Sequence, residues 1–272
     1  MSTRLALLCS LLFGAALVQE AARPARTLEL EYLANEGFLL RGQERRVLVD
    51  AFLTEPYGEY AAVPAELFAR LCKGEGDYGP VALAVTSHVH SDHFQAGAAR
   101  AYLDARSETR FLAAPQVLEK LRAELAPEFP AARLLARWPE GDARLVEGEL
   151  GVELLRLPHA GGARTAAVEN LGLVLEVDGV RVLHVGDAER DDAALTRLDP
   201  AELALDVALV PYWWLDGAEG LARVRARTGA REIVAMHVPP GEVAAVKARL
   251  ARLDARLILF ERPGERRTLR FD

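Results

Sequence analysis

The chain has 272 residues, of which 51% are hydrophobic and 27% are charged, and its net charge is −7 at neutral pH. This length fits one large domain or two small ones, and the composition excludes a disordered or membrane-dominated chain. An acidic chain without a long run of Lys or Arg lacks the positive surface that nucleic-acid binding requires. We therefore expect no nucleic-acid partner.

The first 22 residues have the pattern of a secretory signal peptide. Arg4 supplies a positive charge, an apolar run covers residues 5–18, and small and polar residues with Pro24 follow. The apolar run is shorter than the roughly 20 residues that cross a bilayer. We predict a signal peptide over residues 1–22 and a secreted or periplasmic protein. Cys72 is then the one cysteine of the mature chain, which excludes an intramolecular disulfide.

From residue 27 onward the sequence predicts short strands, followed by alternating strands and helices. The expected strands cover residues 28–33, 37–40, 46–50, 81–86 and 109–113, and the expected helices cover residues 64–71, 94–103 and 115–125. Between residues 127 and 139, three prolines indicate a loop or a short helix and turn.

The second half of the chain repeats this order. Asp178-Gly179 marks a tight hairpin turn between two apolar runs. The expected strands cover residues 143–146, 151–157, 171–177, 180–185, 204–210, 232–236, 257–260 and 268–271, and the expected helices cover residues 218–228 and 242–253. Meanders that lead into β-α units, twice over, predict an α+β domain over residues 27–272, with two mixed sheets covered by helices.

Three of the six histidines lie within the segment His88-Val-His90-Ser-Asp92-His93, after a predicted buried strand. Side chains at positions i and i+2 of an extended turn point the same way, so His88 and His90 can hold one ion. We expect Asp92 and His93 to begin the next helix and to face a second ion. Imidazole and carboxylate ligands suit zinc, and they also accept Mn²⁺ or Fe²⁺. The alternative is a chance cluster of surface histidines, which the position after a buried strand disfavours.

The pattern His-x-His-x-Asp-His after a strand resembles the metallo-β-lactamase superfamily. Three later segments resemble further motifs of this family in the same order. These segments are Leu157-Pro158-His159, His184-Val185-Gly186-Asp187 and Ala235-Met236-His237. The resemblance implies a four-layer αββα sandwich with two metal ions, expected to be Zn²⁺, at the edge of its sheets.

The resemblance also implies a role for each ligand. One ion would be held by His88, His90 and His159, the other by Asp92, His93 and His237, and Asp187 would bridge the two. Asp92 would in addition orient the nucleophile and shuttle its proton, which makes it the expected catalytic residue.

Other residues near these motifs are expected to support the ligands or to contact substrate. Asp50 resembles an early strand-end Asp of the family and is expected to hydrogen-bond a ligand histidine. His184 is expected to be a buried supporting residue, with direct ligation as the alternative. Tyr212, Trp213 and Trp214 follow a predicted strand and are expected to contact substrate, unless at least one of them packs into the core.

The resemblance implies a zinc-dependent hydrolase that uses a metal-bridging hydroxide on a lactone, ester or phosphodiester bond of a small molecule. Asn170-Leu171-Gly172 and the segment around Asp187 resemble the lactonase and N-acylphosphatidylethanolamine phospholipase D-like group. Asp187 argues against β-lactam hydrolysis, because secreted β-lactamases of this fold lack an Asp as the bridging ligand. The alternatives are a non-catalytic metal-binding protein on the same fold and an iron-dependent thiol dioxygenase. No obligate protein partner is inferred.

Overall fold

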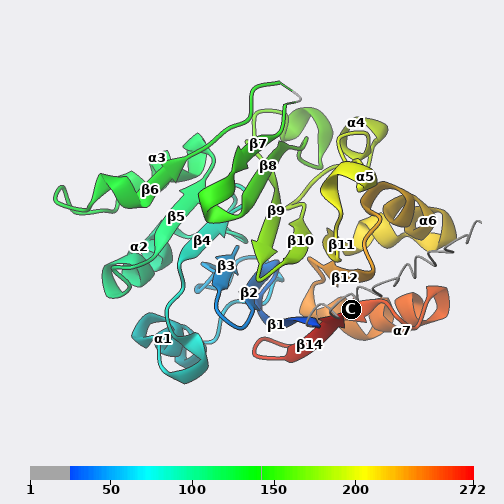
Figure 1. Cartoon of the computed structure of the whole chain (residues 1–272), viewed down its shortest axis with the longest axis horizontal. Coiled ribbons are helices and arrows are strands. Elements are labelled where there is room, and N and C mark those ends of the chain that lie inside the picture. The colour runs from blue at the N-terminus through cyan, green and yellow to red at the C-terminus, as the bar shows by residue number, and fades with distance from the viewer. Residues whose placement is uncertain (1–24, 142) are drawn as a thin grey trace, which may run out of the picture.

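Two seven-stranded sheets pack face to face, with helices on their outer sides, in the computed structural model, which describes residues 25–141 and 143–272 (Figure 1). The α+β four-layer sandwich expected from the sequence is thereby confirmed. Helices α1–α3 lie on one side of the molecule and helices α6 and α7 on the other. The predicted signal peptide falls outside the described residues. Among the helices of the described residues, none has both the length and the apolar character needed to span a bilayer.

The first sheet has the strand order β14-β1-β2-β3-β4-β5-β6. Its strands are β1 (Arg26–Ala34), β2 (Gly37–Arg41), β3 (Arg46–Val49), β4 (Leu83–Thr86), β5 (Arg110–Ala113), β6 (Leu134–Ala136) and β14 (Arg266–Phe271). Strands β14 to β3 are antiparallel and β3 to β6 are parallel. The outer face of this sheet is covered by α1 (Ala65–Lys73), α2 (Ala96–Ala105) and α3 (Pro115–Arg122).

The second sheet has the order β13-β12-β11-β10-β9-β8-β7. Its strands are β7 (Leu145–Glu147), β8 (Val152–Arg156), β9 (Leu171–Val177), β10 (Val180–His184), β11 (Val207–Pro211), β12 (Glu232–Met236) and β13 (Ile258–Leu259). Strands β7 to β10 are antiparallel and β10 to β13 are parallel. The helices of this half are α4 (Asp192–Leu195), α5 (Pro200–Leu203), α6 (Gly217–Thr228) and α7 (Val243–Leu253).

The central strands are apolar on both faces because each sheet is covered on both sides. Phe38 and Leu40 of β2 point into the core between the sheets, whereas Leu39 points into the core beneath α1–α3. This alternation explains why the strands appear in the sequence as continuous apolar runs.

The secondary structure differs from that expected from the sequence at the start of α2 and at β6. Asp92 and His93 lie in a turn, and α2 begins only at Ala96. The helix is delayed because Phe94 pairs with Phe52 and the Gln95 amide donates to the Phe52 carbonyl. Residues 127–139, expected to form a loop or a short helix and turn, contain a 3₁₀ helix at Ala131–Arg133 and, in addition, strand β6, which pairs with β5.

Candidate metal centre

The seven predicted ligands come together where strands of both sheets end. His88, His90, Asp92 and His93 follow β4 of the first sheet, whereas His159, Asp187 and His237 follow β8, β10 and β12 of the second sheet. They form two groups of close side chains that share Asp187. The centre therefore lies across the junction of the two halves of the fold.

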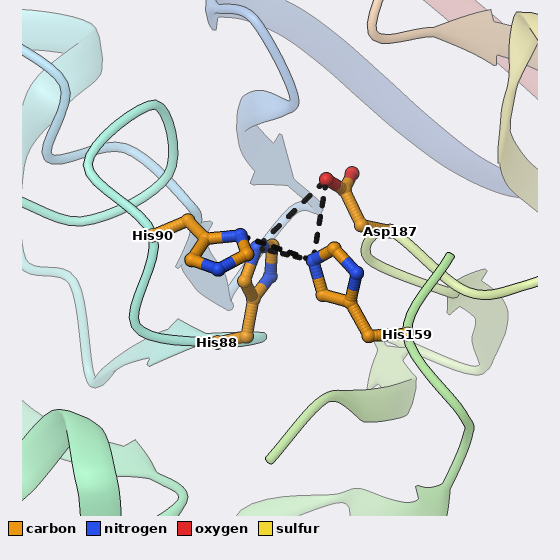
Figure 2. A group of neighbouring side chains, drawn as sticks. All are labelled: His88, His90, His159 and Asp187. Atoms are coloured by element: carbon orange, nitrogen blue, oxygen red, sulfur yellow. Dashed lines mark hydrogen bonds and ion pairs between the residues drawn. The ribbon is translucent and has the colours of Figure 1, made fainter. Parts of the chain in front are cut away.

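The first group contains His88, His90, His159 and Asp187, whose side chains point toward one another (Figure 2). Nε2 of His159 lies 3.3 Å from Nε2 of His88 and 3.1 Å from Nδ1 of His90. Oδ2 of Asp187 lies 3.5 Å from Nε2 of His159 and 3.9 Å from Nε2 of His88. Two ligands bound tetrahedrally at about 2.1 Å are about 3.4 Å apart, so these spacings fit a shared ion.

The second group contains Asp92, His93, His237 and again Asp187. Nε2 of His237 lies 3.3 Å from Oδ2 of Asp92 and 3.2 Å from Oδ1 of Asp187, and Nε2 of His93 lies 3.3 Å from the same Oδ1. Asp187 thus turns Oδ2 to the first group and Oδ1 to the second. Oδ1 of Asp187 and Nε2 of both His93 and His237 are buried without a hydrogen bond. Such orphaned atoms are expected where an ion supplies the missing partner.

The electrostatics of the two groups differ. Burial, followed by the charge of His93, holds the pKa of His88 well below its usual value, so this ring is neutral and ready to ligate. In the second group burial also lowers the pKa of His237, but the carboxylates around it, Asp187 foremost and then Asp92 and Glu36, together raise it to about 10. The carboxylates of this group therefore stabilise a positive charge beside them. A divalent ion can supply that charge in place of a protonated histidine.

Asp50 and Ser87 fix the orientation of His93. Oδ2 of Asp50 lies 3.0 Å from Nδ1 of His93 and accepts a hydrogen bond from the Ser87 hydroxyl, and Oδ1 accepts one from the Ser87 amide. His93 consequently presents Nε2 to Asp187. A carboxylate behind a histidine is the usual way in which a metal ligand is held in position.

His184 and Glu36 are buried behind the second group. Nε2 of His184 lies 3.0 Å from the carbonyl oxygen of Glu36, and Nδ1 accepts a hydrogen bond from the Gly186 amide. Both ring nitrogens are therefore engaged away from the two ligand groups. Burial raises the pKa of the Glu36 carboxyl well above its usual value, and both of its oxygens lack a hydrogen bond.

Asn170 and Gly186 set the position of Asp187. The Asn170 amide group donates to the carbonyl oxygens of Leu157 and Val185, and its Oδ1 accepts a hydrogen bond from the Asp187 amide at 3.2 Å. Gly186 has a φ angle of 57°, and a Cβ atom there would lie 2.4 Å from Oδ1 of Asn170. The tight turn before Asp187 therefore requires glycine.

The three consecutive aromatic residues occupy a single turn of 3₁₀ helix at Tyr212–Leu215 and have different surroundings. Trp214 is 1% exposed and donates from Nε1 to the carbonyl oxygen of Ala188 at 2.9 Å, so it is a core residue. The expectation that Trp214 contacts substrate is therefore replaced by the alternative, that one of the three aromatic residues packs into the core. Trp213 lies with its ring centroid 4.9 Å from that of His237. Tyr212 lies farther out, 3.4 Å from Glu242 through its hydroxyl group.

Tyr60, which was not predicted from the sequence, also packs against the ring of His237. Its ring centroid lies 4.5 Å from that of His237, at an interplanar angle of 75°. Burial and the charges of Asp92 and Asp187 raise the pKa of Tyr60 to about 12, so its hydroxyl group keeps its proton at neutral pH. No local sequence pattern marks this residue, because its neighbour His237 is far away in the chain.

A cavity of 640 Å³ opens beside His159. Its walls include Trp138, Arg156, Pro158 and Glu189. The centre is therefore next to a space large enough for a small molecule.

Solved structures of similar fold share most of the length of the chain. A novel metallo hydrolase from the archaeon Ignicoccus hospitalis is 20% identical, with a TM-score of 0.60 over 90% of this chain and 100% of that one. An isothiocyanate hydrolase from Delia radicum gut bacteria is 14% identical, with a TM-score of 0.59 over 89% and 99% of the two chains. The diiron β-hydroxylase CmlA from Streptomyces venezuelae is 15% identical, with a TM-score of 0.53 over 90% of this chain and 54% of that one.

At these identities the similarity shows the fold. A search among curated protein sequences gave no match. Residues 45–260 match the family model described as "Beta-lactamase superfamily domain". The chain therefore belongs to the β-lactamase superfamily.

Proposed function

We propose that this protein is a hydrolase that holds two divalent metal ions, with zinc preferred, and cleaves a lactone, ester or phosphodiester bond of a small molecule. The observation that carries the proposal is the position of Asp187, which turns one carboxylate oxygen to each of two groups of ligands. A structural zinc site needs one closed set of four ligands, whereas two adjacent sets that share a carboxylate leave room for water and substrate.

Two divalent ions held by these ligands would polarise a substrate oxygen and would lower the pKa of a water molecule toward about 7. The protein's own residues position the reacting groups. Asp50 holds His93 in place, and the Asn170 side chain holds the Asp187 backbone. Asp92, which lies between His93 and His237, orients the attacking water and carries its proton to the leaving group.

The direct test is metal analysis combined with a hydrolase screen on zinc-loaded protein. The screen should span lactones, carboxylic esters, phosphodiesters and thioesters, and the isothiocyanate hydrolase among the structural relatives adds an isothiocyanate. We expect about two metal equivalents per chain, because two groups of ligands are present. The Asp187→Ala variant is expected to lose metal and activity, and Asp104→Ala, an exposed position on α2, is the matched control.

Fewer than one metal equivalent, unchanged by His88→Ala, would contradict the proposal and favour a non-catalytic protein on the same fold. Iron is the second candidate metal, because CmlA is a diiron enzyme of related fold. Iron together with thiol-dependent oxygen uptake would favour the dioxygenase alternative. The same ligand types accept either metal, so the analysis should be made on protein purified without added metal.

Export belongs to the same proposal and rests on the sequence of residues 1–22. Recovery of a mature chain that begins near residue 23 from the periplasm or the medium would support it. A full-length chain found in the cytoplasm would count against it.

A further inference from the structure

The segment between β3 and α1 is fixed where it passes the centre. The Asn35 amide donates to the Ala61 carbonyl, and the Val63 amide donates to the Leu53 carbonyl. The Tyr60 amide donates to the carbonyl of Tyr57 at the exposed tip of the segment. These backbone bonds hold the Tyr60 ring against His237 from the side of the first sheet.

His237 consequently lies between two aromatic side chains. Tyr60 contacts it from the first half of the fold, and Trp213 contacts it from the second half, both in edge-to-face geometry. Edge-to-face aromatic pairs are favourable, so each contact also stabilises the orientation of the ligand ring. A substrate group bound beside His237 would therefore lie close to these two rings.

The hydroxyl group of Tyr60 makes no hydrogen bond among the described residues, and the side chain is only partly exposed. Its charged neighbours are the carboxylates of Asp92 and Asp187. A neutral O–H donor at the mouth of a hydrolytic centre is available for a substrate oxygen.

The charges beside this aromatic pair indicate which substrates fit. Arg190 and Arg249 donate to the backbone carbonyls of Trp213 and Tyr212, and both lie 3.7 Å from Asp216. The single carboxylate of Asp216 therefore offsets part of their positive charge, which weakens them as a site for a phosphodiester anion. A neutral donor beside aromatic rings instead suits an uncharged acyl group with an apolar substituent.

Building on the proposed hydrolase function, we propose that the Tyr60 hydroxyl donates a hydrogen bond to the carbonyl oxygen of an uncharged ester or lactone. As the water oxygen bonds to the carbonyl carbon, the C=O electron pair moves onto the oxygen that Tyr60 faces. When this pair returns, the C–O bond to the leaving group breaks. One proton of the water passes through Asp92 to the oxygen of the leaving group, so water and ester give carboxylic acid and alcohol. Tyr60 keeps its proton throughout.

The test compares Tyr60→Phe with Tyr57→Phe, because Tyr57 is 50% exposed in the same segment and has no contact with the ligands. The probes are dihydrocoumarin, an uncharged lactone, and bis(4-nitrophenyl) phosphate, a phosphodiester. The lactone product, 3-(2-hydroxyphenyl)propanoate, serves as a binding probe that is monitored by tryptophan fluorescence. Metal content is measured on every protein, and it should stay constant because the phenyl ring that packs on His237 is retained.

We expect the metal-loaded wild type to prefer the lactone. Tyr60→Phe should lower kcat/KM for the lactone by about 100-fold, the usual effect of removing one donor to a developing oxyanion. It should also weaken binding of the product carboxylate by at least about tenfold, as for one hydrogen bond to a charged group. Tyr57→Phe should change neither value.

The outcomes separate this inference from the proposed function. If Tyr60→Phe matches Tyr57→Phe in both lactone hydrolysis and product binding, the role of Tyr60 is refuted while the hydrolase proposal stands. A wild type that cleaves only the phosphodiester, or that binds no product, overturns the acyl assignment. A metal-loaded wild type that hydrolyses nothing refutes the proposed function. Product binding by Tyr60→Phe and Tyr57→Phe then still shows whether the Tyr60 hydroxyl donates a hydrogen bond to the ligand.

Discussion

Gly186 offers a test of how the turn before Asp187 supports the centre. Replacing it with alanine places a side chain at a φ angle of 57°, which costs about 1–2 kcal/mol. The new Cβ would also lie 2.4 Å from Oδ1 of Asn170 and 2.9 Å from Cβ of Ser87. Displacing Asn170 leaves buried hydrogen-bonding groups without partners, for about 1–3 kcal/mol more. We therefore expect Gly186→Ala to lower the free energy of unfolding by about 2–5 kcal/mol.

The matched control is Gly76→Ala, because Gly76 has a φ angle of 55° and open space where its Cβ would lie. It should show the backbone effect alone, about 1–2 kcal/mol. Urea denaturation of both variants measures the difference, and metal analysis shows whether Asp187 has moved. Equal destabilisation of the two variants, with full metal content in Gly186→Ala, would refute the reasoning from Asn170.

Three further predictions concern the metals, the core and the junction of the sheets. Chelation by EDTA should lower the melting temperature, because an ion present at 100 times its Kd adds about 2.7 kcal/mol; an unchanged melting temperature would argue against tight binding. Trp214→Phe should destabilise the fold by about 1–3 kcal/mol in urea, since the buried Ala188 carbonyl loses its donor, and should leave KM unchanged. Asp206→Ala should destabilise by a similar amount, because Asp206 accepts hydrogen bonds from the Arg26 side chain and the Arg181 amide; a change below about 0.5 kcal/mol would contradict this expectation.

Elements with strong local signals were predicted well from the sequence. Residues 171–177 and 232–236 have the predicted strand boundaries, because each is an apolar run bounded by turn or polar residues. The strand at Leu134–Ala136 was missed, since it is three residues long among prolines and depends on pairing with β5. The start of α2 shifted for the same kind of reason, because Phe52 pairs with Phe94.

The candidate site shows a similar division. The seven ligand positions were named from motifs, and the structure brings them together in two groups, while metal binding itself stays a prediction. Tyr60 and Glu36 were missed because their contacts with His237 and His184 join segments that are distant in the chain. Trp214 could not be separated from Trp213 in advance, because neighbouring residues of one helical turn point in different directions.

The pairing of β1 with β14 has a consequence for how the protein folds. Arg26 lies opposite Phe271, so the edge of the first sheet is completed by residues from the other end of the chain. During synthesis, strands β1 to β6 emerge long before their last neighbour exists, and β1 exposes an unpaired edge in the meantime. Closing so large a loop is entropically costly and slow. We infer that the first sheet is completed late in folding, when β14 pairs with β1.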